Sequence, residues 1–343
     1  MSAAQAETPR TSQQVEVAIP DVSVIVVSFN TREVLRRCLQ SVQDDGDGLS
    51  AEIIVVDNAS TDGSSEMIAL DFPRARLIRS EINLGFGEGN NVALRLARGR
   101  YFLLLNSDAF FVKGALPLAI RHMDENPSVG LGGCRLIGLD GESQPSARCF
   151  HSVMGDLVVL SGLAARFPKS KFFGRFDRTW ADACKPASVD WVPGAFTILR
   201  PSAIQRVGYF DPAFFLYYEE VDLCRRMKDA GIPVWYWPDI VVIHIGGESS
   251  RQLAAPEYTL HPAQVVLWRM RSKLLYYRKH HGWQVRLAKR MEQTVYLATV
   301  LRNRFSRDPE RRLRAHHHSL LIGLMDQAWK DTNGGRVSPP RPW

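Results

Sequence analysis

A buried strand that ends at an acid constrains this chain more than any other feature. Residues 101–105 (YFLLL) are apolar, and Asn106, Ser107 and Asp108 follow directly. An apolar run of this length is typical of a strand covered on both faces in a parallel sheet. In open α/β sheets, ligands bind beyond the carboxyl ends of the strands. We therefore expect Asp108 to face a ligand or a metal ion.

The same arrangement occurs earlier, where residues 53–56 (IIVV) end at Asp57. Around these runs the pattern alternates between strands and helices. It predicts strands at 22–29, up to 57, at 76–79 and at 100–105, with helices at 31–43, 63–71 and 88–97. Strands that alternate with helices over short loops predict an α/β fold with a mostly parallel, doubly wound sheet and helices on both faces.

The pattern changes after residue 116. A helix to 125 precedes a loop-rich region to 189, and then come a strand at 191–199, an aromatic and acidic segment at 214–227, and a strand at 234–244. From 262 the chain is helical and basic. We expect a disordered N-terminal segment (1–19), an α/β domain (20–255), a helical C-terminal extension (256–330) and a disordered tail (331–343).

Charge and cysteine content restrict the class of protein. The net charge is +7, which suits an anionic partner, but no sequence signature of a nucleic-acid-binding module occurs, so nucleic acid is not expected. Five cysteines without a C-x-x-C pair argue against a disulfide framework or zinc ribbon and favour a cytoplasmic protein. No apolar run approaches the roughly 18 residues of a membrane span. We expect attachment to a membrane to be peripheral at most.

The segment 217–222 (YYEEVD) gathers Glu219, Glu220 and Asp222 within four residues, beside apolar neighbours. Clustered acids in apolar surroundings raise one another's pKa, which suits a carboxylate to work as a general base. If the segment begins a helix, Glu219 and Asp222 share one face and Glu220 points elsewhere. The alternative is a helix N-terminus whose acids satisfy the helix dipole and pair with the two arginines that follow.

His244 ends another apolar run, residues 240–243. A neutral imidazole, together with carboxylate and phosphate oxygens, is a suitable ligand set for Mn²⁺ or Mg²⁺. The end of a strand also places His244 on the same rim of the sheet as Asp108. The alternative is a histidine with a structural role.

The order of the motifs resembles the family 2 glycosyltransferases, with the rhamnosyltransferase-like subgroup as the nearest match. It is carried by 26–30 (VVSFN), 56–63 (VDNASTDG), 83–91 (NLGFGEGNN), 104–108 (LLNSD), 191–195 (WVPGA), 215–226 (FLYYEEVDLCRR) and His244. The resemblance covers residues 20 to 250, and the C-terminal extension is similar too. It implies a GT-A fold for the α/β domain and an inverting transfer of a sugar from a nucleotide donor.

The resemblance also implies which residues bind the nucleotide sugar: Ser28, Asn30, Asp57, Asn83, Gly85, Phe86, Asn106, Ser107, Trp191, Gly194 and Ala195. Among them, Asp57 matches a contact to the base or ribose, and the loop at 83–86 matches one that closes over the nucleoside. Trp191, Gly194 and Ala195 match the floor beneath the donor sugar or the acceptor. For Trp191 the alternative is simple core packing.

The metal and the base are implied in the same way. Asp108 matches the last acid of the family's D-x-D motif, which holds a divalent metal (Mn²⁺ or Mg²⁺) on the diphosphate. The first acid of that motif is replaced here by Asn106, and His244 matches a second protein ligand. Glu220 matches the catalytic base, and Glu219 and Asp222 stay open as alternatives.

The substrates follow only from the resemblance. It implies dTDP-rhamnose as donor, with a UDP-sugar as the alternative, and a glycan or polyprenyl-linked acceptor, in keeping with cell-wall or polysaccharide biosynthesis. A catalytically silent homologue that binds nucleotides or carbohydrates is the alternative of a different class, kept open by Asn106.

The C-terminal extension combines basic residues with the aromatic residues Trp268, Tyr276, Tyr277, Trp283 and Tyr296. This composition suits helices that lie on an anionic membrane, here the inner face of the cell membrane. Packing within the protein and homo-oligomerisation are the alternatives.

Overall fold

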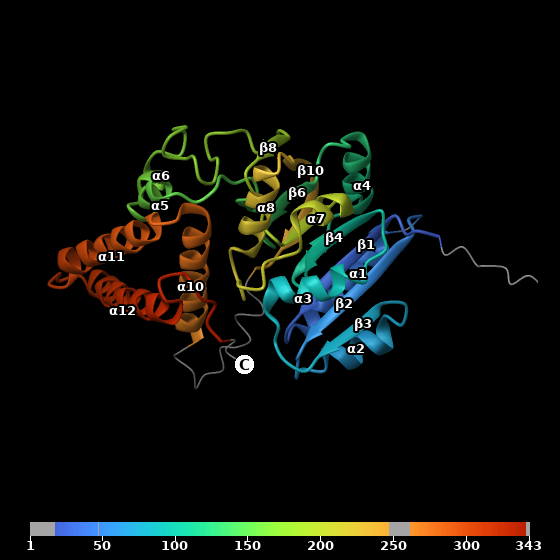
Figure 1. Ribbon diagram of the computed structural model, residues 1–343, viewed down its shortest axis with the longest axis horizontal. Helices are drawn as coiled ribbons and strands as arrows, with labels where there is room; N and C mark the ends of the chain where they lie inside the picture. The colour runs from blue at the N-terminus through green and yellow to red at the C-terminus, as the bar shows by residue number, and fades with distance from the viewer. Residues whose placement is uncertain (1–17, 47, 247–260, 341–343) are drawn as a thin grey trace, which may run out of the picture.

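The computed structural model describes residues 18–46, 48–246 and 261–340, which form an α/β domain and a bundle of C-terminal helices beside it (Figure 1). The predicted boundary at 255, and residues 1–17 and 341–343 of the predicted terminal segments, lie outside the described residues.

The first half of the domain is the predicted parallel sheet. Its strands are β1 (Val22–Ser28), β2 (Ala51–Asn58), β3 (Arg76–Ser80) and β4 (Tyr101–Asn106), in the order β3-β2-β1-β4. The connecting helices are α1 (Arg32–Asp45), α2 (Ser64–Asp71) and α3 (Gly85–Leu94). Every pairing among the four strands is parallel, as the strand–helix alternation predicts.

Helices cover both faces of this sheet. Successive side chains of a strand point to opposite faces. In β1, Val24 and Val26 accordingly belong to the core that α1 completes with Leu35 and Leu39. Ile25 belongs to the core on the other face, which includes the C-terminal end of α3. The doubly wound architecture is therefore confirmed.

The second half makes the sheet mixed. It adds β5 (Ala109–Phe111), β6 (Leu131–Ile137), β7 (Ser143–Gln144), β8 (Ala187–Val189), β9 (Phe196–Leu199) and β10 (Val234–His244), which extend the order to β3-β2-β1-β4-β9-β6-β10-β5. β7 pairs with β6 and β8 with β10. The helices are α4 (Ala115–Glu125), α5 (Val153–Leu160), α6 (Leu163–Arg166), α7 (Pro201–Val207) and α8 (Glu219–Asp229).

The strand expected at 191–199 is shorter in the structure. Trp191 forms only an isolated bridge with Arg148, and regular pairing begins at Phe196. Pro193 and Gly194 lie between the two, and both residue types interrupt strands. β9 runs antiparallel to β4 and to β6, and β5 runs antiparallel to β10, so two strands of this path are reversed.

The topology brings the predicted strand ends to one edge of the sheet. Ser28 lies opposite Asp57, and Val27 lies opposite Asn106. Because β10 runs parallel to β6, and two antiparallel steps through β9 separate β6 from β4, β10 ends at this edge as well. His244 pairs there with Ala109, directly after Asp108.

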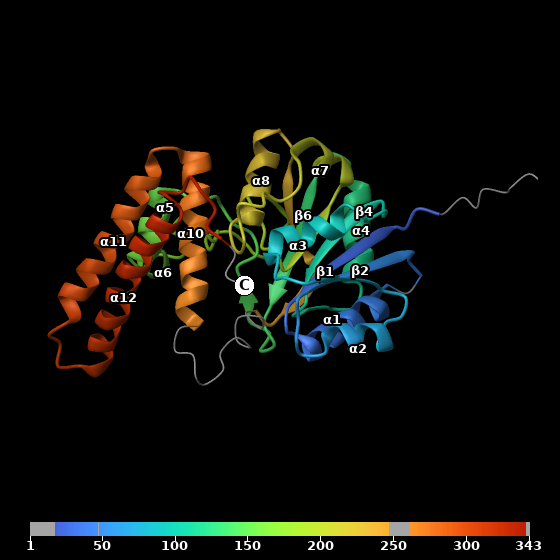
Figure 2. The same ribbon diagram turned by 60° about the horizontal axis from the view of Figure 1, so that its bottom comes forward.

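The C-terminal helices are α10 (His261–His281), α11 (Gln284–Asn303) and α12 (Pro309–Asp331). Figure 2 shows α11 and α12 at the end of the molecule farthest from the parallel strands, with α10 between them and the sheet. Within the described residues, no helix is both long and apolar enough to span a bilayer.

One expectation about this region is wrong, and for the aromatic residues the structure favours the packing alternative. The tail expected to be disordered from 331 is packed as far as 340, where Ser338 Oγ donates to the carbonyl of Ala213 at 2.8 Å. Among the aromatic residues expected at a membrane surface, Trp268, Tyr276, Tyr277 and Tyr296 are buried, and Trp283 alone is exposed. The four buried rings pack inside the protein because α10 and α11 lie against the domain and α12.

Candidate active site

Asn106, Asp108 and His244 meet at the carboxyl edge of the sheet. His244 Nε2 lies 3.5 Å from Asp108 Oδ1 and 3.4 Å from Asn106 Nδ2. The backbone N–H of Ile245 donates to the carbonyl of Asp108 at 3.1 Å, which ties the end of β10 to the end of β4. The structure therefore brings together the three residues that the strand ends predict to be close.

Gln144, in β7, determines the orientation of the His244 ring. Its Nε2 is 2.8 Å from the carbonyl oxygen of His244, and its Oε1 is 2.9 Å from Nδ1 of the same residue. A carbonyl can only accept, so the amide nitrogen must face it, and the amide oxygen then accepts from Nδ1–H. Nε2 is left with its lone pair directed at Asp108 and Asn106. Metal-binding histidines are commonly held in this way by a second hydrogen bond.

The donor set fits a divalent cation in an open site. A carboxylate oxygen and an imidazole nitrogen 3.5 Å apart can bind one ion from two directions. Mg²⁺ and similar ions keep several waters and bind substrate phosphates, so two protein ligands are enough. Among the residues that the structure describes, no cluster of three or more His, Cys, Asp or Glu side chains forms a closed metal site.

A chain of hydroxyl groups lies beneath this edge. Ser28 Oγ is 2.8 Å from Thr31 Oγ1, which donates to Ser107 Oγ at 3.0 Å. Ser28 and Thr31 are fully buried. Ser28 was expected to line the pocket, but its side chain instead supports the turn after β1 and the turn after β4.

Asp57 and Asn30 organise the loops after β2 and β1. Asp57 accepts from the N–H of Ser60 at 3.1 Å and from the hydroxyl of Ser65. Asn30, in the left-handed region with φ 52°, accepts from the N–H of Thr61 at 2.8 Å. Both side chains thus shape the loops where the nucleoside was expected, and Asp57 is almost wholly buried.

Asn58 fixes the loop at 83–86. Its Nδ2 donates to Asn83 Oδ1 at 2.8 Å, and its Oδ1 accepts from the N–H of Leu84 at 2.8 Å. Asn83 Oδ1 also accepts from the N–H of Gly85 at 2.9 Å. Asn58 was not among the predicted site residues, although the motif at 56–63 contains it.

Glycines let the same loop approach the rest of the site. Gly85 has φ 78°, and a Cβ there would lie 2.1 Å from the carbonyl oxygen of Phe215. The N–H of Phe86 donates to that carbonyl at 3.0 Å. A Cβ on Gly194 would come within 3.1 Å of the Phe86 ring. The loop at 83–86 is thereby fitted against the segment that precedes α8 and against the segment that precedes β9.

The surface predicted to lie beneath the donor sugar or the acceptor is only partly accessible. The carbonyl of Ala195 accepts from the N–H of Asn106 at 3.0 Å, so Ala195 lies at the same edge of the sheet as Asp108 and His244. Trp191 is 4% exposed, donates from Nε1 to the carbonyl of Cys149 at 2.9 Å, and lies under the Arg148 guanidinium. These contacts favour the core-packing alternative for Trp191.

A strained turn begins the acidic helix. Tyr217 and Tyr218 both have left-handed backbones, with φ 68° and 69°. For bulky residues this conformation costs about 1–3 kcal/mol each, and it persists only where the surroundings impose it. The Tyr218 ring packs between His151 and Tyr276, at centroid distances of 4.8 and 5.4 Å. α8 then begins at Glu219, as the helix prediction requires.

Two glutamates at the start of α8 have raised pKa values. Burial raises the pKa of Glu219 well above its ordinary value, and the charge of Glu220 raises it further. Burial also raises the pKa of Glu220, while the Arg148 charge opposes the shift. Among the described residues, neither Glu219 Oε2 nor Glu220 Oε2 has a hydrogen-bond partner. Unpaired carboxylate oxygens of this kind suit a general base.

Asp222 has a different environment. It is fully buried and accepts from Arg226 Nε at 2.8 Å, and its other oxygen lies 2.7 Å from both Lys279 Nζ and His280 Nε2. Burial opposes ionisation, but the hydrogen bond from His280 and the charges of Arg226 and Lys279 prevail and lower the pKa to about 2. A carboxylate held by three basic groups is a poor base, so this geometry favours Glu220 or Glu219.

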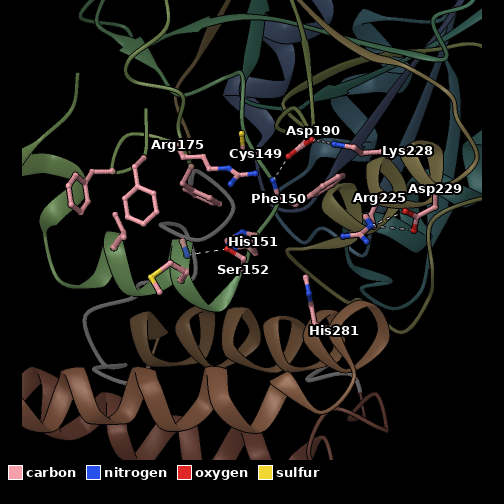
Figure 3. A pocket seen from close by; sticks show the side chains of 16 residues that line it. Cys149, Phe150, His151, Ser152, Arg175, Asp190, Arg225, Lys228, Asp229 and His281 are labelled. Carbon is pink, nitrogen blue, oxygen red and sulfur yellow. Dashed lines mark hydrogen bonds and ion pairs between the residues drawn. The ribbon is translucent and has the colours of Figure 1, made fainter. Parts of the chain in front are cut away.

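A cavity of about 390 Å³ lies behind the strained turn, between α5, α8 and the end of α10 (Figure 3). Aromatic rings and basic groups line it, including Phe150, Phe176, Arg175, Arg225 and His281. None of the predicted site residues is in its lining. The cavity is separate from the edge that holds Asp108 and His244, but His151 in its wall touches the Tyr218 ring of the turn.

Comparison with known proteins finds the family that the motifs resemble. The family model described as "Glycosyl transferase family 2" matches residues 23–183. The chain is 25% identical over 279 residues to the N-acetylglucosaminyl-diphospho-decaprenol L-rhamnosyltransferase of Mycobacterium tuberculosis, covering 76% of this chain and 85% of that protein. It is 26% identical over 266 residues to the rhamnosyltransferase WbbL of Escherichia coli K12, covering 74% and 94%.

Over residues 23–183 the chain matches glycosyl transferase family 2, and over about three quarters of its length it is similar to rhamnosyltransferases. Solved structures agree on the fold of this glycosyltransferase. A mannosyltransferase from Pyrobaculum calidifontis, in complex with GDP-Man and Mn²⁺, matches with a TM-score of 0.55 and 17% identity over 92% of this chain and 88% of that one. GalNAc-T7 with UDP, GalNAc and Mn²⁺ matches with a TM-score of 0.52 and 14% identity over 93% and 58%. The α/β domain has the GT-A fold that the sequence motifs predict.

Besides Asn58, Gln144 is a residue of this site that sequence reasoning missed. It lies in the region after 125 for which the pattern predicts only loops and short strands, and no motif contains it. Its role emerges only when the pairing of β7 with β6 brings it beside the end of β10.

Proposed function

We propose that this glycosyltransferase moves rhamnose from dTDP-rhamnose to a hydroxyl group of a glycan or polyprenyl-linked acceptor, with inversion at the sugar carbon. The single observation that supports the site most strongly is the convergence of Asp108 and Asn106 on His244 at the sheet edge, with each side chain within 3.5 Å of His244 Nε2. The donor and acceptor are inferred from the rhamnosyltransferase relatives, one of which acts on a decaprenol-linked sugar by its name.

In the proposed complex, the nucleoside lies against the loops after β1 and β2 and beneath the loop at 83–86. Asn30 and Asp57 hold the first two loops in shape, and Asn58 holds the third. Phe86 and Gly194 lie together where the donor sugar would leave the diphosphate. The hydroxyl groups of Ser28 and Ser107 support this surface from below through Thr31.

Asp108 and the Nε2 lone pair of His244 would hold Mn²⁺ or Mg²⁺, with Asn106 beside them. A bound divalent ion supplies positive charge that stabilises the diphosphate leaving group as the glycosidic bond breaks. Asn106 contributes an amide where the fuller family motif has an acid, so the protein supplies one negative charge fewer.

Glu220 is the proposed base. Its carboxylate takes the proton from the acceptor hydroxyl as that oxygen attacks the sugar carbon opposite the leaving diphosphate. A single displacement of this kind inverts the configuration and needs no covalent nucleophile. Glu219 contacts α3 across Gly87 and is the alternative base.

The cavity behind the turn supports an acceptor with both apolar and anionic parts. Phe150 and Phe176 offer ring surfaces, and Arg175 offers positive charge, whereas Arg225 is paired with Asp229 of the same lining. Because His151 connects this cavity to the turn that carries Glu220, an acceptor seated there would be close to the base. We also propose peripheral contact with an anionic membrane through the C-terminal helices, where a polyprenyl-linked acceptor would reside.

The proposal is tested by a thermal-shift screen of nucleotide sugars with and without Mn²⁺, since a ligand that binds the native state raises its apparent stability. We expect dTDP-rhamnose to raise the melting temperature, with a larger shift when Mn²⁺ is present. A larger shift of the melting temperature with UDP-sugars than with dTDP-rhamnose would indicate that a UDP-sugar is the donor. Binding without turnover in the presence of acceptor would favour a silent homologue.

A further inference from the structure

The outer face of α11 carries large apolar side chains in the solvent. Trp283, Leu287, Leu297, Leu301 and Phe305 are 71%, 45%, 49%, 57% and 82% exposed. At about 100° per residue along a helix, these positions fall within roughly 80° of the circumference. They therefore form one stripe, which runs from just before the helix to just after its end and also holds Arg290 and Thr294 between Leu287 and Leu297. We call this stripe the outer face of α11.

The buried side of the same helix lies opposite this stripe. It consists of Val285, Ala288, Glu292, Tyr296 and Asn303. A surface helix of a globular protein normally turns charged and polar residues to the solvent on the side away from its core. α11 instead has apolar residues on two opposite sides, and only one of them is covered by the described protein.

The charges beside the outer face are nearly all positive. α11 contains the exposed residues Arg286, Arg290 and Arg302, and the Arg304 guanidinium lies 4.4 Å from the centroid of the Phe305 ring. Lys289 of the same helix is instead paired with Asp326 of α12. The helix's one acid, Glu292, is buried and bonded to Lys273 and Tyr296. The exposed stripe is therefore bordered by basic residues and by no acid of its own helix.

We propose that the outer face of α11 lies in the interfacial region of a bilayer that contains anionic phospholipids. Apolar side chains bordered by Arg and Lys are the pattern of helices that lie flat in that region, where each basic residue near an anionic surface adds to the attraction. A second copy of this chain is the less suitable partner, because pairing two such faces would set basic residues against basic residues. Leu313 and Leu320 of α12 are also exposed and extend the apolar surface of the helical pair.

This inference locates the membrane contact of the proposed function and rests on that part of it, but it does not depend on the reaction. The experiment is flotation of the full-length protein with vesicles of phosphatidylcholine alone or mixed with phosphatidylglycerol. The test variant combines Leu297→Ser, Leu301→Ser and Phe305→Ser. The matched control replaces two exposed leucines of the α/β domain, Leu70→Ser and Leu139→Ser, which are 80% and 62% exposed.

We expect the wild type and the control to bind the phosphatidylglycerol vesicles, and the triple variant to bind them roughly tenfold more weakly or worse, because it loses apolar groups that would enter the interface. Wild-type binding by the triple variant would overturn the inference, and so would equal binding of the wild type to neutral vesicles. A dimer in solution that the triple variant dissociates, with vesicle binding unchanged, would assign the face to a second copy instead.

Donor binding, measured without vesicles by the thermal shift with dTDP-rhamnose and Mn²⁺, separates this inference from the proposed reaction. Because the outer face of α11 holds no residue of the active site, we expect the triple variant and the wild type to give the same shift. Loss of vesicle binding with donor binding intact would support the membrane face. Failure of donor binding in the wild type would count against the proposed reaction while leaving the vesicle result valid.

Discussion

Replacing Gln144 by leucine tests how the candidate metal site is built. The substitution keeps a side chain of similar size but leaves Nδ1–H and the carbonyl of His244 without their partners at 2.9 and 2.8 Å. Each hydrogen bond contributes about 1 kcal/mol, so the two together contribute about 2 kcal/mol to the placement of the ring. Loss of such supporting hydrogen bonds lowers metal affinity by about 10- to 100-fold.

The assay is titration of the protein with Mn²⁺ in the presence of a nucleoside diphosphate, followed by calorimetry and by the electron paramagnetic resonance signal of free Mn²⁺. We expect Gln144→Leu to bind Mn²⁺ about 10- to 100-fold more weakly, with a melting temperature that shows the fold to be intact.

Gln144→Glu is the matched control. A carboxylate still accepts from Nδ1–H and leaves the lone pair on Nε2, although it cannot donate to the carbonyl of His244. We expect this variant to keep most of the Mn²⁺ affinity. Unchanged affinity in Gln144→Leu would refute the role of Gln144. Equal losses in both variants would refute the argument that the tautomer of His244 is what matters.

Three further predictions follow from the charges around α8. Glu220→Gln should keep the donor-induced thermal shift while lowering the transfer rate by about 100-fold or more, since general-base catalysis is worth about that much; a variant with wild-type turnover would move the base elsewhere. Burial raises the pKa of Glu220, so on acidification the activity should be lost at a pH above the ordinary pKa of a glutamate. The Arg148 charge opposes this shift, so Arg148→Leu should move the loss of activity to higher pH in a kcat/KM profile. The pKa of Asp222 falls to about 2 on folding, which stabilises the native state by about 2 kcal/mol above pH 4 and is lost as the pH drops towards 2. Urea unfolding of Asp222→Asn should therefore show a loss of about this size at pH 7 that shrinks at pH 3.

The sheet and its functional edge could be predicted because they depend on local patterns. The apolar run before Asp108 and the run before His244 mark strands by composition alone, and parallel strands then place their ends at one edge. No long-range detail is needed for that step. The same reasoning extended the strand before Phe196 too far, because apolar residues such as Trp191 also occur in segments that pack without pairing.

Side-chain roles could not be predicted where the partner is distant in sequence. Asp222 looks like one of three equivalent acids until α10 brings Lys279 and His280 to it from 57 and 58 residues away. Ser28 looks like a pocket residue until Thr31 and Ser107 enclose it. In each case, tertiary packing decides whether a polar group faces a ligand or another part of the protein.

The C-terminal helices contribute both to the proposed reaction and to the proposed membrane contact. α10 supplies Tyr276 to the ring stack on Tyr218 and supplies Lys279 and His280 to Asp222, so it supports the turn and the helix that carry Glu220. α11 packs against α10 and α5 and presents its outer face to the solvent. Deleting the extension from residue 262 would therefore uncover a buried carboxylate and release the strained turn as well as remove the proposed membrane contact. A loss of activity in that truncation would say nothing about membranes, which is why serine substitutions confined to the outer face of α11 are the decisive test.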